Sequence, residues 1–175
     1  FVNSMSDLFH EDTTMEFIRQ VFTVMMATPK HQYQVLTKRP EKMAEMLKEL
    51  EAEGVYTPSA HIWLGTSVED SRVWSRVDAL REVPAVIRFL SCEPLIGPLP
   101  EDMDFTGIAW VIAGGESGVH LWKESARARR ALVDVSGNTW TPREERVCWI
   151  RAIRDACHEQ KVAFFFKQWG GATPK

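Results

Sequence analysis

Short apolar runs rich in β-branched and aromatic residues alternate along this chain with longer stretches of helical period. This alternation predicts βα units, in which successive strands lie parallel and a helix connects them. We predict an α/β fold, a parallel β/α barrel of the TIM type (complete or partial), as a single domain over residues 1–175. An open doubly wound sheet satisfies the same pattern. The runs with strand character are Phe1–Ser4, Tyr33–Thr37, Ile62–Gly65, Val86–Leu90, Ile108–Ala113 and Val162–Phe166.

Helical period marks the intervals between these runs. At the start of the first helix, Thr13 and Glu16 have the spacing of a capping box. Gly54 is a predicted helix stop. Thr141 and Pro142 are the predicted N-cap and first residue of the last helix. The predicted helices cover residues 14–27, 41–53, 71–83 and 141–159. The inward face of the last helix is predicted to carry Val147, Ile150, Ile153 and Cys157.

A long excursion, residues 114–140, follows the fifth predicted strand. Within it, residues 133–140 have the pattern of a hairpin with a Ser-Gly turn. Residues 123–130 form the one concentrated basic run of the chain. Such a run is typical of a solvated helical face, or of a surface that binds nucleic acid or a partner protein through residues 123–140.

Composition excludes several classes of protein. A net charge of -3 and a pI near 6.0 do not indicate a surface that coats nucleic acid, although a local basic groove remains compatible. No apolar run reaches the roughly 18 residues of a membrane helix, so we expect no membrane association. The three cysteines, Cys92, Cys148 and Cys157, are too scattered for a disulfide framework, and a cytoplasmic location is expected. Histidine and cysteine spacing predicts no metal site.

Polar residues follow each strand-like run. In parallel α/β folds, ligands bind at the carboxyl ends of the strands, where these residues would lie. Strand ends are also where any chain leaves the core, so a purely structural role for each residue stays open. The collective pattern predicts a pocket for a charged, nucleotide-like small molecule. The predicted substrate-pocket residues are Asn3, Ser4, Asp7, Lys38, Arg39, Ser67, Glu69, Glu93, Lys167 and Gln168.

Individual segments allow two interpretations each. Gly114–Ser117 permits close approach of backbone to a ligand, or is a loop that needs positive φ. Lys38 and Arg39 suit a phosphate or carboxylate, or form a solvated pair. Lys167 suits a Schiff base or a lysine that reaches water. Cys92 is placed for a nucleophile, but a buried structural cysteine is favoured.

Six blocks carry a family resemblance: FVNSMSDLFHED, YQVLTKRPEKM, WLGTSVED, RFLSCEPLIGP, WVIAGGESG and FFFKQWGG. In this order they resemble a family of phage and prophage proteins of unknown function, which is itself similar to radical-SAM-type β/α barrels. The resemblance implies S-adenosylmethionine and a [4Fe–4S] cluster as cofactors. It places Gly114, Gly115 and Glu116, with Ser117 beside them, at S-adenosylmethionine. The three-cysteine segment of that family is absent, which predicts a fragment of a longer protein or a chain without radical chemistry.

Three functions follow as hypotheses. The first is a radical-SAM-like barrel enzyme that acts on a nucleotide or nucleic-acid-type substrate. The second is a non-catalytic phage protein that binds a host factor through the excursion. The third is a cofactor-independent barrel enzyme that uses Lys167.

Overall fold

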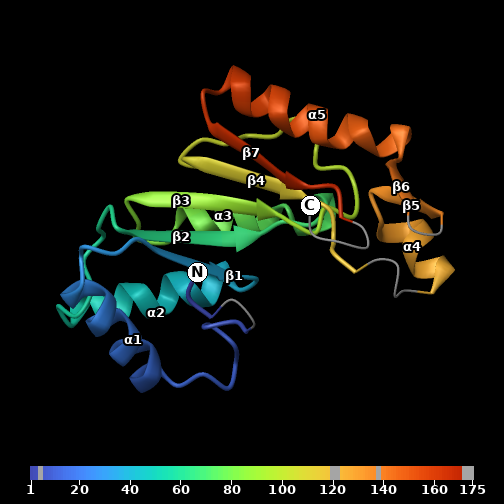
Figure 1. Cartoon of the computed structure of the whole chain (residues 1–175). Helices are drawn as coiled ribbons and strands as arrows, with labels where there is room; N and C mark the ends of the chain where they lie inside the picture. Colours follow the sequence, from blue (N-terminus) through green and yellow to red (C-terminus); the bar gives the residue numbers. More distant parts are fainter. Residues whose placement is uncertain (4–5, 119–122, 137–138, 171–175) are drawn as a thin grey trace. The chain divides into compact units, whose positions relative to one another are not determined.

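The computed structural model describes residues 1–3, 6–118, 123–136 and 139–170 (Figure 1). It has a mixed α/β fold on a mainly parallel five-stranded sheet with the order β1-β2-β3-β4-β7. β1 pairs in parallel with β2, and β4 pairs in parallel with β7. These pairings confirm the α/β class and the parallel arrangement, whereas closure into a barrel stays a prediction. The strands are β1 (Tyr33–Thr37), β2 (Ile62–Ser67), β3 (Ile87–Cys92), β4 (Trp110–Gly114) and β7 (Ala163–Gln168).

The chain divides into two compact units. Unit 1 comprises Phe1–Ser67, Ser75–Leu90 and Gly107–Ala109, and unit 2 comprises Val68–Trp74, Ser91–Thr106 and Trp110–Lys175. Both units contain fully buried apolar side chains, among them Phe22 in unit 1 and Ile153 in unit 2.

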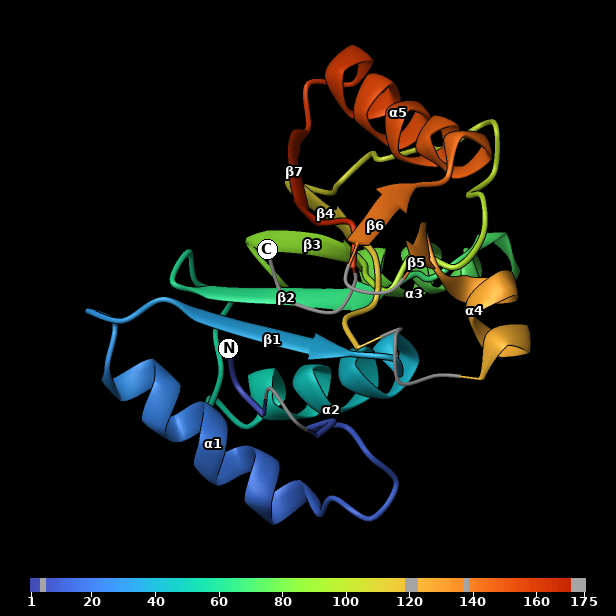
Figure 2. The same cartoon turned by 45° about the vertical axis from the view of Figure 1, so that its right-hand side comes forward.

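Unit 1 contains α1 (Met15–Ala27), α2 (Pro40–Ala52) and α3 (Ser75–Arg81). α1 and α2 lie on the same side of β1 (Figure 2). α1 buries Ile18, Phe22 and Met25, which recur at helical spacing and form its core face. The Phe22 ring meets the Tyr56 ring edge-on, with 5.2 Å between the centroids. Gly54 follows α2 with φ +73°, as the predicted helix stop requires.

Helix boundaries in the first half of the chain differ from the prediction, most clearly for α1 and α3. α1 begins one residue later than the capping box implied, because Thr14, not Thr13, accepts the hydrogen bond from the Phe17 amide. The predicted helix over 71–83 is split into a 3-10 turn, η1 (Ser71–Val73), and the shorter α3. The Asp70 side chain caps η1 at the Arg72 amide, and this tight turn interrupts the helical period.

The predicted first strand is reduced to a single bridge. Val2 pairs in parallel with Val35, and its amide donates to the carbonyl of Gln34 at 2.8 Å. Asn3 then adopts φ 53°, a left-handed conformation that ends an extended run. Ser4, the fourth residue of the prediction, lies outside the described residues.

In unit 2, α5 (Glu144–Glu159) packs against β4 and β7 (Figure 1). The excursion contains α4 (Glu124–Arg130) and an antiparallel pair, β5 (Val133–Ser136) and β6 (Thr139–Pro142). These strands confirm the predicted hairpin, whose turn lies outside the described residues. The buried residues of α5 confirm its predicted inward face; they are Val147, Ile150, Ile153 and Cys157.

The predicted start of the last helix is wrong. Thr141 and Pro142 belong to β6, where Pro142 stands opposite Val133. The amide of Arg143 donates to the carbonyl of Leu132 at 2.9 Å, so strand pairing continues beyond the expected cap. Strand pairing therefore takes the residues that a capping box would have used, and α5 begins at Glu144.

The connection from β3 to β4 contains no helix in its described residues 93–109. Its path is held by Gln160, whose side-chain amide donates to the carbonyl of Met103 and accepts from the amide of Phe105, both at 2.7 Å. A single side chain thus fixes the middle of the connection to the end of α5.

Within the described residues, no helix combines the length and the apolar character needed to cross a bilayer.

Candidate functional site

In unit 1, Asp7 lies at the carboxyl end of β1. Its carboxylate accepts hydrogen bonds from the hydroxyl of Thr37 at 2.7 Å and from the guanidinium of Arg39 at 2.8 Å. The amides of Phe9 and Lys38 donate to the same carboxylate at 3.0 and 3.3 Å. The structure thus brings together two predicted pocket residues, Asp7 and Arg39, in an arrangement that ties the residues after Asp7 to the end of β1.

The environment of Asp7 favours its ionised form. Burial alone raises the pKa of the carboxyl, but the hydrogen bonds from Thr37, the Phe9 and Lys38 amides and Arg39 outweigh burial and lower the pKa below its ordinary value. A lowered folded-state pKa stabilises the fold above the unfolded-state pKa of about 3.9. That stabilisation is lost as the pH falls through the lower folded-state value.

Asp7→Asn is therefore expected to lower the free energy of unfolding by about 2 kcal/mol at neutral pH, since hydrogen bonds to charged groups contribute roughly 1.5–3 kcal/mol. The difference from the wild type should shrink below about pH 4, as the wild-type carboxyl becomes protonated. Urea unfolding across this pH range measures both effects. Asp12→Asn is the matched control, because the side chain of Asp12 is 93% exposed. A difference that persists unchanged in acid would contradict the prediction.

The other predicted residues near the ends of β1 and β2 differ in their exposure. Asn3 and Lys38 are exposed. Ser67 in unit 1 is buried, and its carbonyl accepts from the Arg76 guanidinium at 3.0 Å. Glu69 in unit 2 is buried, and its carbonyl accepts from the amide of Ile96 at 3.0 Å. In both of these hydrogen bonds the acceptor belongs to the backbone.

In unit 2, polar side chains converge at the carboxyl ends of β3, β4 and β7. The ammonium of Lys167 lies 2.9 Å from one carboxylate oxygen of Glu93, and the Gln168 amide donates to the other at 3.2 Å. The same amide nitrogen lies 2.7 Å from Ser117 Oγ and 3.2 Å from the carbonyl oxygen of Gly115, so three acceptors share its two N–H groups. We call these residues, Glu93, Gly115, Ser117, Lys167 and Gln168, the Glu93 cluster. It contains five of the predicted site residues.

The side chains of the Glu93 cluster differ in exposure. The Glu93 side chain is 17% exposed, and that of Lys167 is 53% exposed. A partly buried carboxylate is thus oriented by two donors, one of which faces solvent. Among the described residues, the Lys167 ammonium makes one ion pair, so two of its three N–H groups are available to a ligand.

The paired glycines at the end of β4 pack against the main chain. A Cβ at Gly115 would lie 2.6 Å from the carbonyl carbon of Trp169 and still closer to its oxygen. At Gly114 the nearest atom would be the carbonyl oxygen of Gln168, at 3.2 Å. Glycine is needed here because the backbone after β7 approaches closely. This contact accounts for Gly115 independently of any ligand.

Glu116 links α4 to the segment that carries Gly115 and Ser117 of the Glu93 cluster. Its carboxylate lies 2.8 Å from the guanidinium of Arg130 at the end of α4. Trp169, directly after β7, packs against the buried Ala131 and Val133. These two contacts hold α4 and β5 beside the carboxyl ends of β4 and β7.

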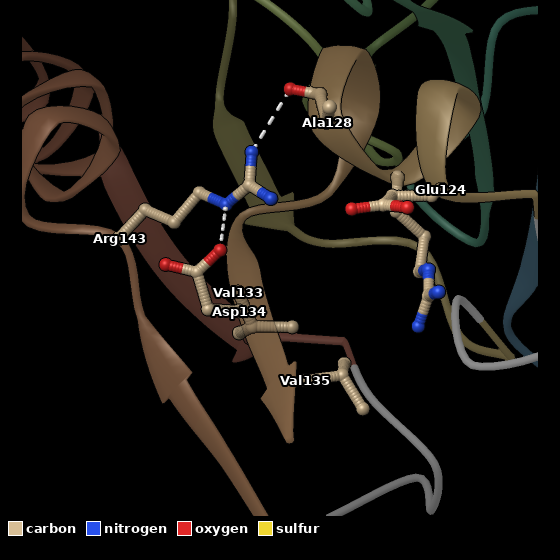
Figure 3. A pocket seen from close by; sticks show the side chains of 7 residues that line it. Glu124, Ala128, Val133, Asp134, Val135 and Arg143 are labelled. Carbon is tan, nitrogen blue, oxygen red and sulfur yellow. Dashed lines mark hydrogen bonds and ion pairs between the residues drawn. The ribbon is translucent and has the colours of Figure 1, made fainter. Parts of the chain in front are cut away.

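A pocket of about 170 Å³ lies between α4 and β5 (Figure 3). In it, the Arg143 guanidinium bridges the Asp134 carboxylate at 2.8 Å and the carbonyl of Ala128 at 2.9 Å. No hydrogen bond or ion pair within the described part of the chain holds the guanidinium of Arg127. The lining residues are Glu124, Arg127, Ala128, Val133, Asp134, Val135 and Arg143.

Arg143 and Arg146 have a structural role at the end of α4. Arg146 donates to the carbonyls of Ala128, at 2.6 Å, and of Ala131. Burial, followed by the neighbouring charge of Arg143, lowers the pKa of Arg146. Because the last carbonyls of a helix lack internal partners, these two cations stabilise the carboxyl end of α4.

The described residues do not supply a site for an iron–sulfur cluster. No three His, Cys, Asp or Glu side chains among them are placed to hold a metal ion. Cys92 and Cys157 are buried and Cys148 is exposed. Burial raises the pKa of the Cys92 thiol, with smaller effects from Cys157 and Glu69, which agrees with a structural cysteine. The Glu93 cluster, in contrast, offers both an anionic and a cationic group to a zwitterionic ligand.

Several residues of this region had no signal in the sequence. Arg130 lies 14 positions from Glu116, within a basic run in which no residue stands out. The sequence predicted no role for Arg143 and Arg146, because their contacts with Ala128 and Ala131 depend on how β6 turns back.

These observations define a mixed α/β protein that carries polar side chains at the carboxyl ends of parallel strands. The chain belongs to the family described as "Protein of unknown function (DUF5131)", whose match covers residues 1–175. Comparisons with curated proteins and with solved structures gave no significant match.

Proposed function

We propose that this chain is a phage-type, radical-SAM-like barrel protein, an S-adenosylmethionine-dependent enzyme that acts on a nucleotide or nucleic-acid-type substrate. The observation that carries the proposal is the Glu93 cluster, in which Glu93, Lys167 and Gln168 converge at the carboxyl ends of the strands. Ligands of parallel α/β sheets bind at this edge. The radical-SAM assignment rests on the family resemblance. The role of a [4Fe–4S] cluster as cofactor rests on the same resemblance.

The chemistry of the Glu93 cluster suits the amino-acid end of S-adenosylmethionine. That end carries a carboxylate and an ammonium group, and the bound molecule supplies an activated carbon–sulfur bond. The exposed Lys167 ammonium would pair with the ligand carboxylate, and Glu93 would accept from the ligand ammonium. Gln168 keeps the Glu93 carboxylate oriented and ties it to Ser117 on the β4 side. Each polar group of the Glu93 cluster then has a defined role.

The substrate class is supported by the position of the basic helix. α4 carries Arg127, Arg129 and Arg130 in its last turn and has no buried residue. Its Arg130 contacts Glu116, which directly follows the Gly114-Gly115 end of β4. Cations beside a strand-end site suit a ligand with phosphate groups.

Glu93→Gln and Lys167→Met are each expected to weaken the binding of S-adenosylmethionine about tenfold or more, since a hydrogen bond to a charged group contributes roughly 1.5–3 kcal/mol. Isothermal titration calorimetry measures the affinity, and thermal unfolding with and without the ligand gives a second readout. Lys30→Met, a substitution of an exposed lysine, is the matched control. Equal affinities in all four proteins would refute the assigned roles.

A second candidate is a non-catalytic protein that binds a host factor through the excursion. The pocket between α4 and β5 favours it, because Arg127 has no polar partner among the described residues and α4 is exposed. A wild-type protein that gives no heat with S-adenosylmethionine would shift the assignment to this candidate.

A further inference from the structure

Unit 2 carries a larger and mainly apolar hollow of about 420 Å³, between α5 and the segment 98–103. We call it the α5 groove. Its volume lies within the range of roughly 300–1,000 Å³ that is usual for ligand sites. It is separate in its lining from both the Glu93 cluster and the α4 pocket. The lining residues are Pro98, Leu99, Pro100, Glu101, Met103, Cys148, Trp149, Ala152, Ile153, Asp155, Ala156 and Glu159.

The shape of the groove follows from the α5 sequence. Ala152 and Ala156 are one helical turn apart. Their small side chains leave a depression in the helix surface between Trp149 and Glu159. Ile153 is fully buried, and the Met103 side chain of the facing segment is 8% exposed. The floor is therefore apolar and offers a place for an apolar side chain.

The wall opposite α5 is held in place by hydrogen bonds. Gln160 bridges the backbone of Met103 and Phe105, with both distances at 2.7 Å. The amide of Ser71 donates to the carbonyl of Pro98 at 3.0 Å. Because both ends of the wall are fixed, a ligand would bind with little ordering cost.

The charges of the groove all have one sign. Among the described residues that line it, the charged side chains are the carboxylates of Glu101, Asp155 and Glu159, without a Lys, Arg or His. Asp155 pairs with its neighbour Arg154 at 2.7 Å. In the part of the chain that the structure describes, Glu101 and Glu159 have no hydrogen-bonding or ion-pair partner. Glu101 lies on the loop wall and Glu159 on the helix wall, so the negative charge is spread along the rim.

We propose that the α5 groove binds a peptide segment of a partner protein, in which an apolar side chain is flanked by lysine or arginine. The apolar side chain occupies the hollow over Ala152 and Ala156. The flanking cations meet Glu101 on the loop wall and Glu159 on the helix wall. This binding activity is independent of the Glu93 cluster and of the proposed enzyme function.

The test uses the whole chain and a fluorescein-labelled peptide with two central leucines flanked on both sides by paired lysines. Fluorescence anisotropy measures affinity. Alkylation of Cys148 by iodoacetamide reports occupancy, because Cys148 lines the groove and is exposed while Cys92 and Cys157 are buried. We expect the peptide to slow the alkylation of Cys148. The double variant Glu101→Gln/Glu159→Gln should bind about tenfold more weakly, because it removes both of the proposed ion pairs.

Two further variants and two further ligands decide the outcome. Ala152→Phe should fill the groove and remove the protection of Cys148, whereas Glu49→Gln, which removes one exposed charge on α2, should change nothing. A peptide with glutamates in place of the lysines should bind at least about tenfold more weakly.

The proposal is overturned if the lysine peptide fails to protect Cys148, or if both peptides bind equally. It is also overturned if hexylammonium protects Cys148 as well as the peptide does, which would indicate a small-molecule site. If Ala152→Phe does not fold, the double carboxylate variant still decides.

Discussion

Gly115→Ala is expected to lower the free energy of unfolding by about 3 kcal/mol, the upper end of the usual cost of overpacking. A methyl group at this position would overlap the Trp169 carbonyl group, whose carbon would lie only 2.6 Å away. The obstacle is main chain, which cannot rotate away as a flexible side chain can. The amide of Gly115 also donates to the carbonyl of Gln168 at 2.8 Å, so the two segments cannot separate without losing a hydrogen bond. Urea unfolding measures the loss.

Gly114→Ala is the matched control for this substitution. Its methyl group would meet the carbonyl oxygen of Gln168 at 3.2 Å, a contact that a small shift relieves. The expected loss is about 1 kcal/mol or less. Equal losses at Gly114 and Gly115 would show that the close approach of Trp169 is not the cause. A stable Gly115→Ala protein that loses only S-adenosylmethionine affinity would instead assign the glycine pair to the ligand.

Phe89→Ala is expected to lower the free energy of unfolding by about 3–5 kcal/mol, the usual cost of removing a buried phenylalanine. The Phe89 side chain is fully buried in unit 1. Its ring lies over Gly65, where a Cβ would come within 2.6 Å of the ring atoms. No side chain at position 65 is present to fill the space that the ring leaves. The cavity therefore persists, and chemical denaturation should show the full loss.

The pairing of Gly65 with Phe89 can be tested by a double-mutant cycle. Gly65→Ala alone should cost about 1–3 kcal/mol, because the new methyl group meets the ring. With Phe89→Ala the ring is absent, so the double variant should lose less than the sum of the single losses by about 1 kcal/mol or more. The control is Phe22→Ala. No atom of Phe22 is among those nearest to a Cβ at position 65, so the losses for Gly65→Ala and Phe22→Ala should add. Additive losses for Gly65 and Phe89 would contradict the proposed contact.

Local chemistry in the sequence determined the type and approximate extent of most elements. The apolar run Tyr33–Thr37 became β1 with the predicted bounds, and Gly54 ended α2 because it accommodates a positive φ. The spacing of Val147, Ile150, Ile153 and Cys157 determined the inward face of α5, since a helix places such residues on one side. The runs that formed strands had the β-branched and aromatic composition that favours them. These are properties of residues close together in the chain.

Only the tertiary structure decided which of several local options prevailed. Thr141 and Pro142 satisfy a helix cap in sequence, yet their pairing with β5 placed them in β6. Its position at a strand end made Glu93 a predicted site residue. Its contact with Lys167, however, joins residues 74 positions apart and was not predictable from local sequence. The α5 groove likewise needs the segment 98–103 opposite α5. The hydrophobic periodicity of the sequence does not predict that these two segments lie together. Side chains distant in sequence meet only through packing of the strands and helices that carry them, so the composition of the sites is a property of the fold.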